Sequence, residues 1–222
     1  MIIEEIIAEL KKNSCPEDRE GMRRFGIDPQ YALGVRVPVM RGLAKKIGRD
    51  HKTALALWQT NIHEARILAS MVEELDKVTE KQMDHWIRDF NSWDVCDQCC
   101  MNLFDKMPFA YNKAKRLAKD EREFTRRAGF ALMAALAFHD KKADDDKFRE
   151  FFPSIIKYAE DKRNFVKKAV NWALRQIGKR NHMLGEDAIR VAEEILRRYP
   201  DSTAARWIAR DAIRELEEKH KH

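Results

Sequence analysis

Apolar residues recur at three- and four-residue spacing through most of this 222-residue sequence, a period typical of helices that pack by one face. Glycine and proline are scarce, at eight and six residues. No Asn-Gly or Asp-Gly pair marks a β-hairpin. The sequence therefore predicts an all-α protein without strands.

The same spacing, together with helix start and stop signals, sets the expected helix bounds. The predicted helices span residues 2–12, 16–24, 38–48, 51–59, 63–75, 80–90, 92–106, 108–118, 122–138, 144–160, 162–179, 185–198 and 202–219. The signals used are Pro38 in a first turn, a capping box of Thr79 and Gln82, a cap of Asn91 with Asp94, and helix ends at Gly178 and Pro200.

A weak internal repeat links two of these helices. Arg127 and Lys168 each precede an alanine and, a few residues later, an Ala-Leu pair, and they lie 41 positions apart. This offset falls within the roughly 40–47-residue period of HEAT-type helical repeats. We therefore expect residues 1–222 to form one domain, a curved solenoid of antiparallel helix pairs with a concave binding face. A helical bundle without repeats is the alternative.

Positive charge is concentrated in residues 162–180, which contain seven bases and no acid. The remainder of the chain holds 36 bases against 37 acids, so it is almost neutral. Focused basicity of this kind is typical of a surface that binds the nucleic-acid backbone. On charge alone, the ligand could be DNA, RNA or an acidic protein.

No stretch approaches the roughly 20 apolar residues that span a bilayer, and glutamates stand near the N-terminus where a signal peptide has lysines. Cys15 is isolated, and Cys96, Cys99 and Cys100 crowd one predicted helix, which is no disulfide framework. We expect a cytoplasmic, nucleoid-associated protein. The three clustered cysteines fit small buried hydrophobic residues better than a zinc site, because a second CxxC and a nearby histidine set are missing.

The predicted helix at 162–179 has two distinct faces. Helical spacing places one group along a single stripe: Phe165, Lys168, Trp172, Arg175 and Lys179. It places a second group on the opposite, apolar side: Val166, Ala169, Val170, Ala173, Leu174 and Ile177. Trp172 interrupts the charged stripe, so it either faces a ligand or packs between layers with solvated bases around it.

A second candidate site lies in residues 91–97. Trp93 and Asp97 stand four positions apart and share one helix face. An aromatic face attracts a cation, and a partly desolvated carboxylate stabilises positive charge or accepts a proton from water. The alternative is that Asp97 pairs with an arginine while Trp93 fills a gap between repeats.

Further bases extend the expected binding surface. Arg127 is either an ordinary surface residue or, by its equivalence to Lys168 in the repeat, a phosphate ligand on the same face. A further basic cluster comprises Arg23, Arg24, Arg36, Arg41, Lys45, Lys46 and Arg49. Two basic regions this far apart in sequence suit a surface that holds a duplex at both ends.

In combination, four segments of the chain resemble the AlkD-type DNA alkylation repair family, which are DNA glycosylases built on HEAT-like repeats. They occur in the family's order and cover nearly the whole chain: Leu33-Gly34-Val35-Arg36-Val37-Pro38, Ser92-Trp93-Asp94-Val95-Cys96-Asp97, Thr125-Arg126-Arg127-Ala128, and Val166-Lys167-Lys168-Ala169-Val170-Asn171-Trp172-Ala173-Leu174-Arg175.

The resemblance implies that Trp93, Asp97 and Trp172 are the catalytic residues, two tryptophans and a carboxylate around the deoxyribose of the damaged nucleotide. It implies phosphate contact by Arg127 and DNA contact by Arg175. Phe25 stands where a well-known member has tyrosine, so a hydroxyl is missing at that position.

By this resemblance the chain is expected to hydrolyse the N-glycosidic bond of cationic N3- or N7-alkylated purines in duplex DNA as a monomer, with no metal and no cofactor. The expected DNA-binding residues are Arg127, Lys168, Arg175, Lys179, Arg36, Arg41 and Phe25. Two alternatives stay open: a non-catalytic member that binds DNA structures, and a helical-repeat scaffold for an acidic protein.

Overall fold

The computed structural model describes residues 1–220 and consists there of α-helices, 3-10 helices and connecting turns, with no strand in that range. The all-α prediction is confirmed. The backbone divides into two compact units, residues 1–107 and residues 108–222, which are described separately below. Within the described range, no helix has both the length and the apolar composition needed to cross a membrane.

Unit 1 is arranged around one central helix, which packs against four others, α1, α3, α4 and α7. The core beside it contains a stacked pair of indoles, Trp58 and Trp86, with ring centroids 4.1 Å apart. The central helix is α5, and the α-helices of the unit are α1 (Ile3–Lys12), α2 (Pro16–Gly21), α3 (Val37–Ile47), α4 (His51–Gln59), α5 (His63–Val72), α6 (Glu80–Arg88) and α7 (Trp93–Asn102). Short 3-10 helices are η1 (Met22–Phe25), η2 (Pro29–Tyr31), η3 (Leu75–Lys77) and η4 (Phe104–Lys106).

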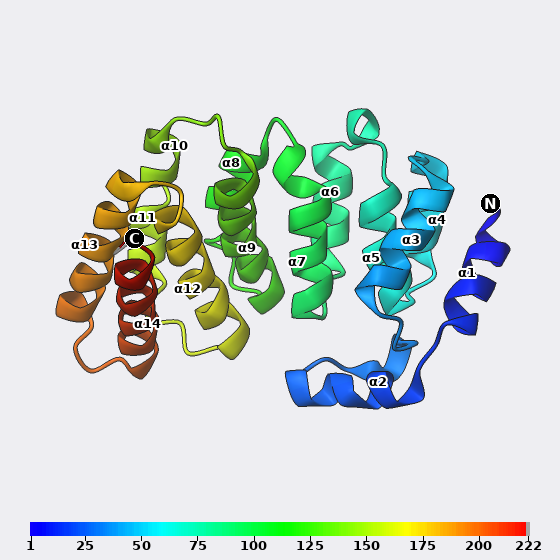
Figure 1. Ribbon diagram of the computed structural model, residues 1–222, viewed down its shortest axis with the longest axis horizontal. Helices are drawn as coiled ribbons and strands as arrows, with labels where there is room; N and C mark the ends of the chain where they lie inside the picture. The colour runs from blue at the N-terminus through cyan, green and yellow to red at the C-terminus, as the bar shows by residue number, and fades with distance from the viewer. Residues whose placement is uncertain (221–222) are drawn as a thin grey trace. The chain divides into compact units, whose positions relative to one another are not determined.

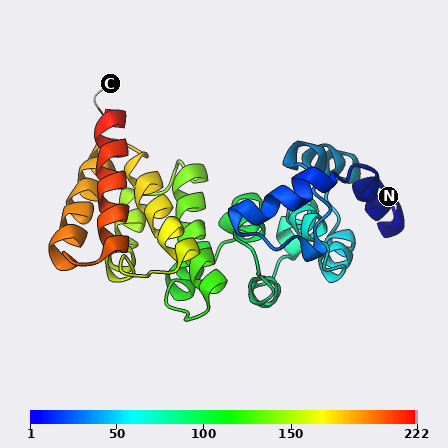
Figure 2. The same ribbon diagram turned by 90° about the horizontal axis from the view of Figure 1, so that it is seen from below.

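Unit 2 contains a row of three helices, α9, α12 and α14, of which each packs on the next (Figure 1). A second layer covers this row, with α8 against α9, and α13 against both α12 and α14 (Figure 2). The helices are α8 (Ala110–Leu117), α9 (Glu123–His139), α10 (Asp145–Arg149), α11 (Phe152–Lys157), α12 (Asn164–Gly178), α13 (His182–Arg198) and α14 (Thr203–His220).

The helix starts of unit 2 repeat at close to the spacing that the sequence predicts. The successive helices α9, α12 and α14 begin at Glu123, Asn164 and Thr203. The side chain of Asn171 in α12 donates to the carbonyl oxygen of Ile208 in α14 at 3.1 Å, which fixes one repeat against the next. In unit 1 the corresponding step is shorter, from the start of α5 to the start of α7.

Close packing explains one glycine within a helix. A Cβ built on Gly129 of α9 would lie 2.3 Å from the backbone nitrogen of Ala118, next to the end of α8. The two backbones can approach this closely only because position 129 has no side chain. The alanine-rich residues that follow, from Ala131 to Ala137, are almost completely buried.

Several details of the predicted helices are wrong. The predicted helices 16–24 and 92–106 each end in a 3-10 helix, η1 and η4, after the shorter α-helices α2 and α7. Residues 144–160 form two short helices, α10 and α11, because Pro153 stands in the first turn of α11 and has no N–H to continue a preceding helix. The N-cap residue of α7 is Ser92, whereas the sequence favoured Asn91. Thr79 caps α6 as predicted, and α12 ends at Gly178.

Candidate nucleic-acid interface

The first two turns of α7 present Trp93 and Asp97 on one face, and both side chains are half-buried. The indole N–H of Trp93 donates to the carbonyl oxygen of Phe25 at 3.0 Å. The Phe25 ring itself is 68% exposed. The structure therefore brings together three of the predicted site residues, and a backbone carbonyl orients the Trp93 ring.

A buried ion pair anchors this turn to α5. Nε2 of His63, the first residue of α5, lies 2.7 Å from Oδ2 of Asp94, and the hydroxyl of Ser92 donates to the other carboxylate oxygen. Burial alone would lower the pKa of His63, but the hydrogen bond and charge of Asp94 outweigh it and raise that pKa. Burial would raise the pKa of Asp94, and His63 and Ser92 together lower it. Sequence reasoning missed His63, whose only local signal is its place at the start of a predicted helix.

Asp94 and Asp97 thus lie in different environments, although both belong to α7. Asp94 turns toward α5 and is committed to His63 and Ser92. Asp97 lies on the face of Trp93, where positive charge on a ligand would be met by an aromatic ring and a carboxylate together. Of these two carboxylates, Asp97 is the one that shares the helix face of Trp93.

The loop before α3 is held by a buried carboxylate. Glu64 of α5 is 2% exposed and accepts hydrogen bonds from the backbone N–H groups of Leu33, Gly34 and Val35 at 2.9, 2.7 and 3.2 Å. Gly34 has a φ of +77°, and a Cβ there would meet the carbonyl oxygen of Cys15 at 2.2 Å. These constraints explain Gly34 and fix the backbone of residues 33–35.

Arg36 and Arg41 lie in different settings on unit 1. Arg36 follows the loop, and its guanidinium pairs with Asp18 at 2.5 Å while its side chain stays 73% exposed. This hydrogen bond lowers the pKa of Asp18. Arg41 is exposed on α3 and lines an open groove of about 380 Å³ with Lys45 and Arg49. Both arginines are accessible to a ligand from solvent.

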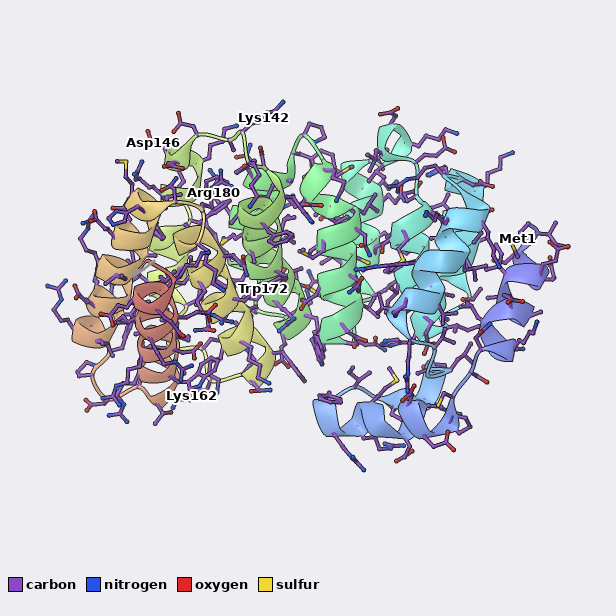
Figure 3. All side chains as sticks on the ribbon, in the orientation of Figure 1. Met1, Lys142, Asp146, Lys162, Trp172 and Arg180 are labelled. Carbon is purple, nitrogen blue, oxygen red and sulfur yellow. The ribbon has the colours of Figure 1, made fainter. Side chains whose placement is uncertain are left out.

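On unit 2, the apolar face of α12 is buried as predicted, with each of its six residues fully inaccessible to solvent. Trp172 is half-buried and Lys168 is exposed on the other side. Figure 3 marks Trp172 along α12, with Lys162 before the helix and Arg180 after it. The sequence thus identified the two faces of this helix correctly.

Acids from neighbouring segments neutralise part of the basic segment 162–180. Arg175 and Lys179 both pair with Glu215 of α14. Arg163 pairs with Asp161 at 2.5 Å. Arg180 donates to three backbone carbonyls and stacks on Phe148. Lys162 and Lys168 remain the exposed bases of the segment.

Arg127 is more buried than the repeat suggested. It is 5% exposed, and one guanidinium nitrogen donates to the carbonyl oxygen of Phe165 at 2.5 Å. This contact ties α9 to the first turn of α12. The neighbouring rings of Phe124 and Phe165 stack with centroids 5.6 Å apart.

Sequence reasoning missed a basic and aromatic surface on α14. Trp207 is 41% exposed, and Arg206, Arg210 and Arg214 follow at four-residue spacing around it. The signal was present in that spacing, but acids in the same stretch make the helix appear nearly neutral.

The cysteine prediction is confirmed for the α7 cluster. Cys96, Cys99 and Cys100 are fully buried, and burial raises the pKa of the Cys99 and Cys100 thiols far above the usual range. Such thiols are inert small hydrophobic groups. Across residues 1–220, no group of three or more histidine, cysteine or acidic side chains is arranged to hold a metal ion.

Comparison with known proteins agrees with this architecture. The model of a family described as DNA alkylation repair enzyme matches residues 6–216. One solved structure matches with a TM-score of 0.79 and 19% sequence identity, over 87% of this chain and 83% of that chain. It is described as a new family of proteins related to the HEAT-like repeat DNA glycosylases, with affinity for branched DNA structures. The likeness shows that the fold is HEAT-like, as predicted. No curated protein matches the sequence.

Proposed function

Because the chain belongs to the DNA alkylation repair enzyme family, we propose that it is a monofunctional DNA glycosylase for cationic N3- and N7-alkylated purines in duplex DNA. The observation that carries this proposal is the first turn of α7. There, Trp93 is oriented by the Phe25 carbonyl and shares its face with Asp97. An aromatic ring and a carboxylate together attract positive charge, which suits a sugar that becomes a cation.

The chemistry needs no strong general acid. An N3- or N7-alkylated purine carries positive charge, so heterolysis of the bond from C1′ to the base returns an electron pair that neutralises the leaving purine. The sugar becomes an oxocarbenium ion, which the Trp93 ring and the Asp97 carboxylate stabilise. A water oxygen then bonds to C1′, and its proton passes to Asp97. On the family resemblance alone, we also propose a catalytic role for Trp172 of α12.

The remaining residues are proposed to position the duplex. Exposed bases are the strongest candidates for phosphate contact, since each neutralised phosphate releases condensed counterions. Lys168, Arg41 and Arg36 are exposed, and Phe25 offers an exposed ring beside Trp93. Four candidates, Arg36 among them, already hold partners that a phosphate must displace: Arg36, Arg127, Arg175 and Lys179.

The test is release of free base from a duplex that contains N7-methylguanine. Wild-type protein should release the base, and Asp97→Asn should suppress release at least about 100-fold, in the range that positioned acid–base groups contribute. Asp76→Asn, which alters an exposed carboxylate of η3, is the matched control and should act like wild type. The proposal fails if wild type and Asp97→Asn release base at the same rate, or if neither releases any.

A second candidate function is non-catalytic binding of DNA structures, and the similarity to a structure described as having affinity for branched DNA favours it. In that case wild type and Asp97→Asn should bind DNA equally and neither should release base. If the protein were instead a scaffold for an acidic protein, its affinity for DNA should be weak and should depend little on salt. A salt titration separates it from both DNA-binding functions, because several phosphate contacts give a steep slope.

A further inference from the structure

The first three turns of α14 carry an aromatic and basic surface. Its central residue, Trp207, exposes 41% of its surface although tryptophan is usually well buried. An open groove of about 450 Å³ runs along this side of the helix. The side chains that line it are Thr203, Arg206, Trp207, Arg210, Asp211 and Arg214.

The charge of this surface is positive once internal pairs are considered. Asp211, the acid in the groove, is shared between Arg175 of α12 and Arg214. Within the part of the chain that the structure describes, Arg210 has no ion pair and is exposed. Arg206 donates to the carbonyl of Pro200 at 3.3 Å, which leaves its charge unneutralised. Glu217 and Glu218 stand further along the helix and bound the basic region at that end.

A contact with α12 joins this surface to the candidate interface of unit 2. The ammonium of Lys167 lies 4.8 Å from the centroid of the Trp207 ring. Trp207 is the fifth residue of α14, as Lys168 is the fifth residue of α12. Trp207 therefore occupies on α14 the helix position that the exposed Lys168 occupies on α12, one repeat earlier, and Asn171 fixes these two helices together.

We propose that this surface binds an unpaired segment of a DNA strand, with Trp207 stacked on a base and the α14 arginines on phosphates. An exposed indole can stack only on a base whose face is free, and duplex bases are covered by their neighbours. Arg206, Arg210 and Arg214 rise about 6 Å from one to the next along the helix, a step comparable with one nucleotide of an extended strand. The inference rests on the proposed function only in taking DNA as the ligand.

The test compares an unmodified blunt duplex with the same duplex carrying a single-stranded 3′ oligothymidine overhang, by fluorescence anisotropy with the full chain. Wild type should bind the overhang duplex more tightly. Trp207→Ala should weaken binding to it by about 5- to 150-fold, as loss of one base stack predicts, and Trp207→Phe should retain most of the affinity. Arg210→Ala should also lower the salt slope by about 0.7.

Arg197→Ala is the matched control, since it removes an exposed arginine from α13, and it should leave both affinities unchanged. The proposal is overturned if wild type shows no preference for the overhang, or if Trp207→Ala keeps that preference while its circular dichroism spectrum is that of wild type. Base release from an alkylated blunt duplex is measured in parallel on wild type. Loss of base release with intact overhang binding refutes only the glycosylase, and the reverse result refutes only the α14 surface.

Discussion

The ion pair between His63 and Asp94 makes a quantitative prediction about unit 1. The side chains are 6% and 20% exposed, so solvent screens the interaction little. A hydrogen bond to a charged group contributes about 1.5–3 kcal/mol, with two charged partners at the upper end of this range and one charged partner at the lower end. His63→Gln keeps a neutral N–H donor at similar reach but cannot be protonated. The variant should therefore lose about 1–1.5 kcal/mol of unfolding free energy where the imidazole is charged.

The two pKa shifts determine how the stability difference between wild type and His63→Gln changes with pH. The pKa of His63 is raised above 6.5, so its contribution is complete below that value and is lost as pH rises through the folded pKa. The pKa of Asp94 is lowered below 3.8, so its contribution is complete above that value and is lost only in stronger acid. The stability gap between wild type and His63→Gln should thus be widest between about pH 4 and 6.5 and should shrink toward pH 9.

Urea unfolding followed by tryptophan fluorescence measures the gap, because the stacked Trp58 and Trp86 report the core of unit 1. His85→Gln is the matched control, since His85 is 48% exposed and lies 3.8 Å from its carboxylate partner, Asp89. Its effect should be close to zero at every pH. A gap for His63→Gln that stays constant from pH 5 to 9, or that equals the control, refutes the reasoning.

Two further predictions concern packing and charge. Gly129→Ala should destabilise the protein by about 1–3 kcal/mol, because the added Cβ meets the backbone at the end of α8. Gly21→Ala is the control and should be neutral or slightly stabilising, because the space around Gly21 is open. Thermal unfolding of the two variants measures the difference. Lys168→Ala should lower the salt slope of duplex binding by about 0.9, while Arg175→Ala should change it less because Glu215 already neutralises that arginine. Equal slopes for the two variants would contradict the ion-pair assignment.

Local sequence signals predicted the helices well because period and caps act over a few residues. Pro38, Thr79 and Gly178 each stand where the sequence placed a helix boundary. The offset between Arg127 and Lys168 was likewise readable, since repeated packing needs repeated apolar positions. The failure at Pro153 is also local, and its ring gives sufficient reason for the break.

Charge pairing over long sequence separations could not be predicted in the same way. Glu215 neutralises Arg175 across 40 residues, and no local rule says which acid of a later helix will face which base. The burial of Arg127 was unpredictable for the same reason, because its guanidinium donates to a backbone carbonyl 38 residues away. A count of bases along one segment therefore overestimated the positive surface of α12 and missed that of α14.

The start of α7 explains why the proposed glycosylase mechanism uses the Trp-x-x-x-Asp pair, Trp93 and Asp97, rather than the adjacent Trp93 and Asp94. Each helical residue turns about 100° from the last, so Asp94 points away from the Trp93 face and toward α5, while Asp97 returns to that face one turn later. A carboxylate that already receives hydrogen bonds from His63 and Ser92 must give them up to meet a developing cation. In the proposed mechanism the anchor and the reactive group are therefore two residues on different faces of successive turns, Asp94 and Asp97. Rigid attachment through Asp94 is what lets Trp93 and Asp97 keep a fixed geometry.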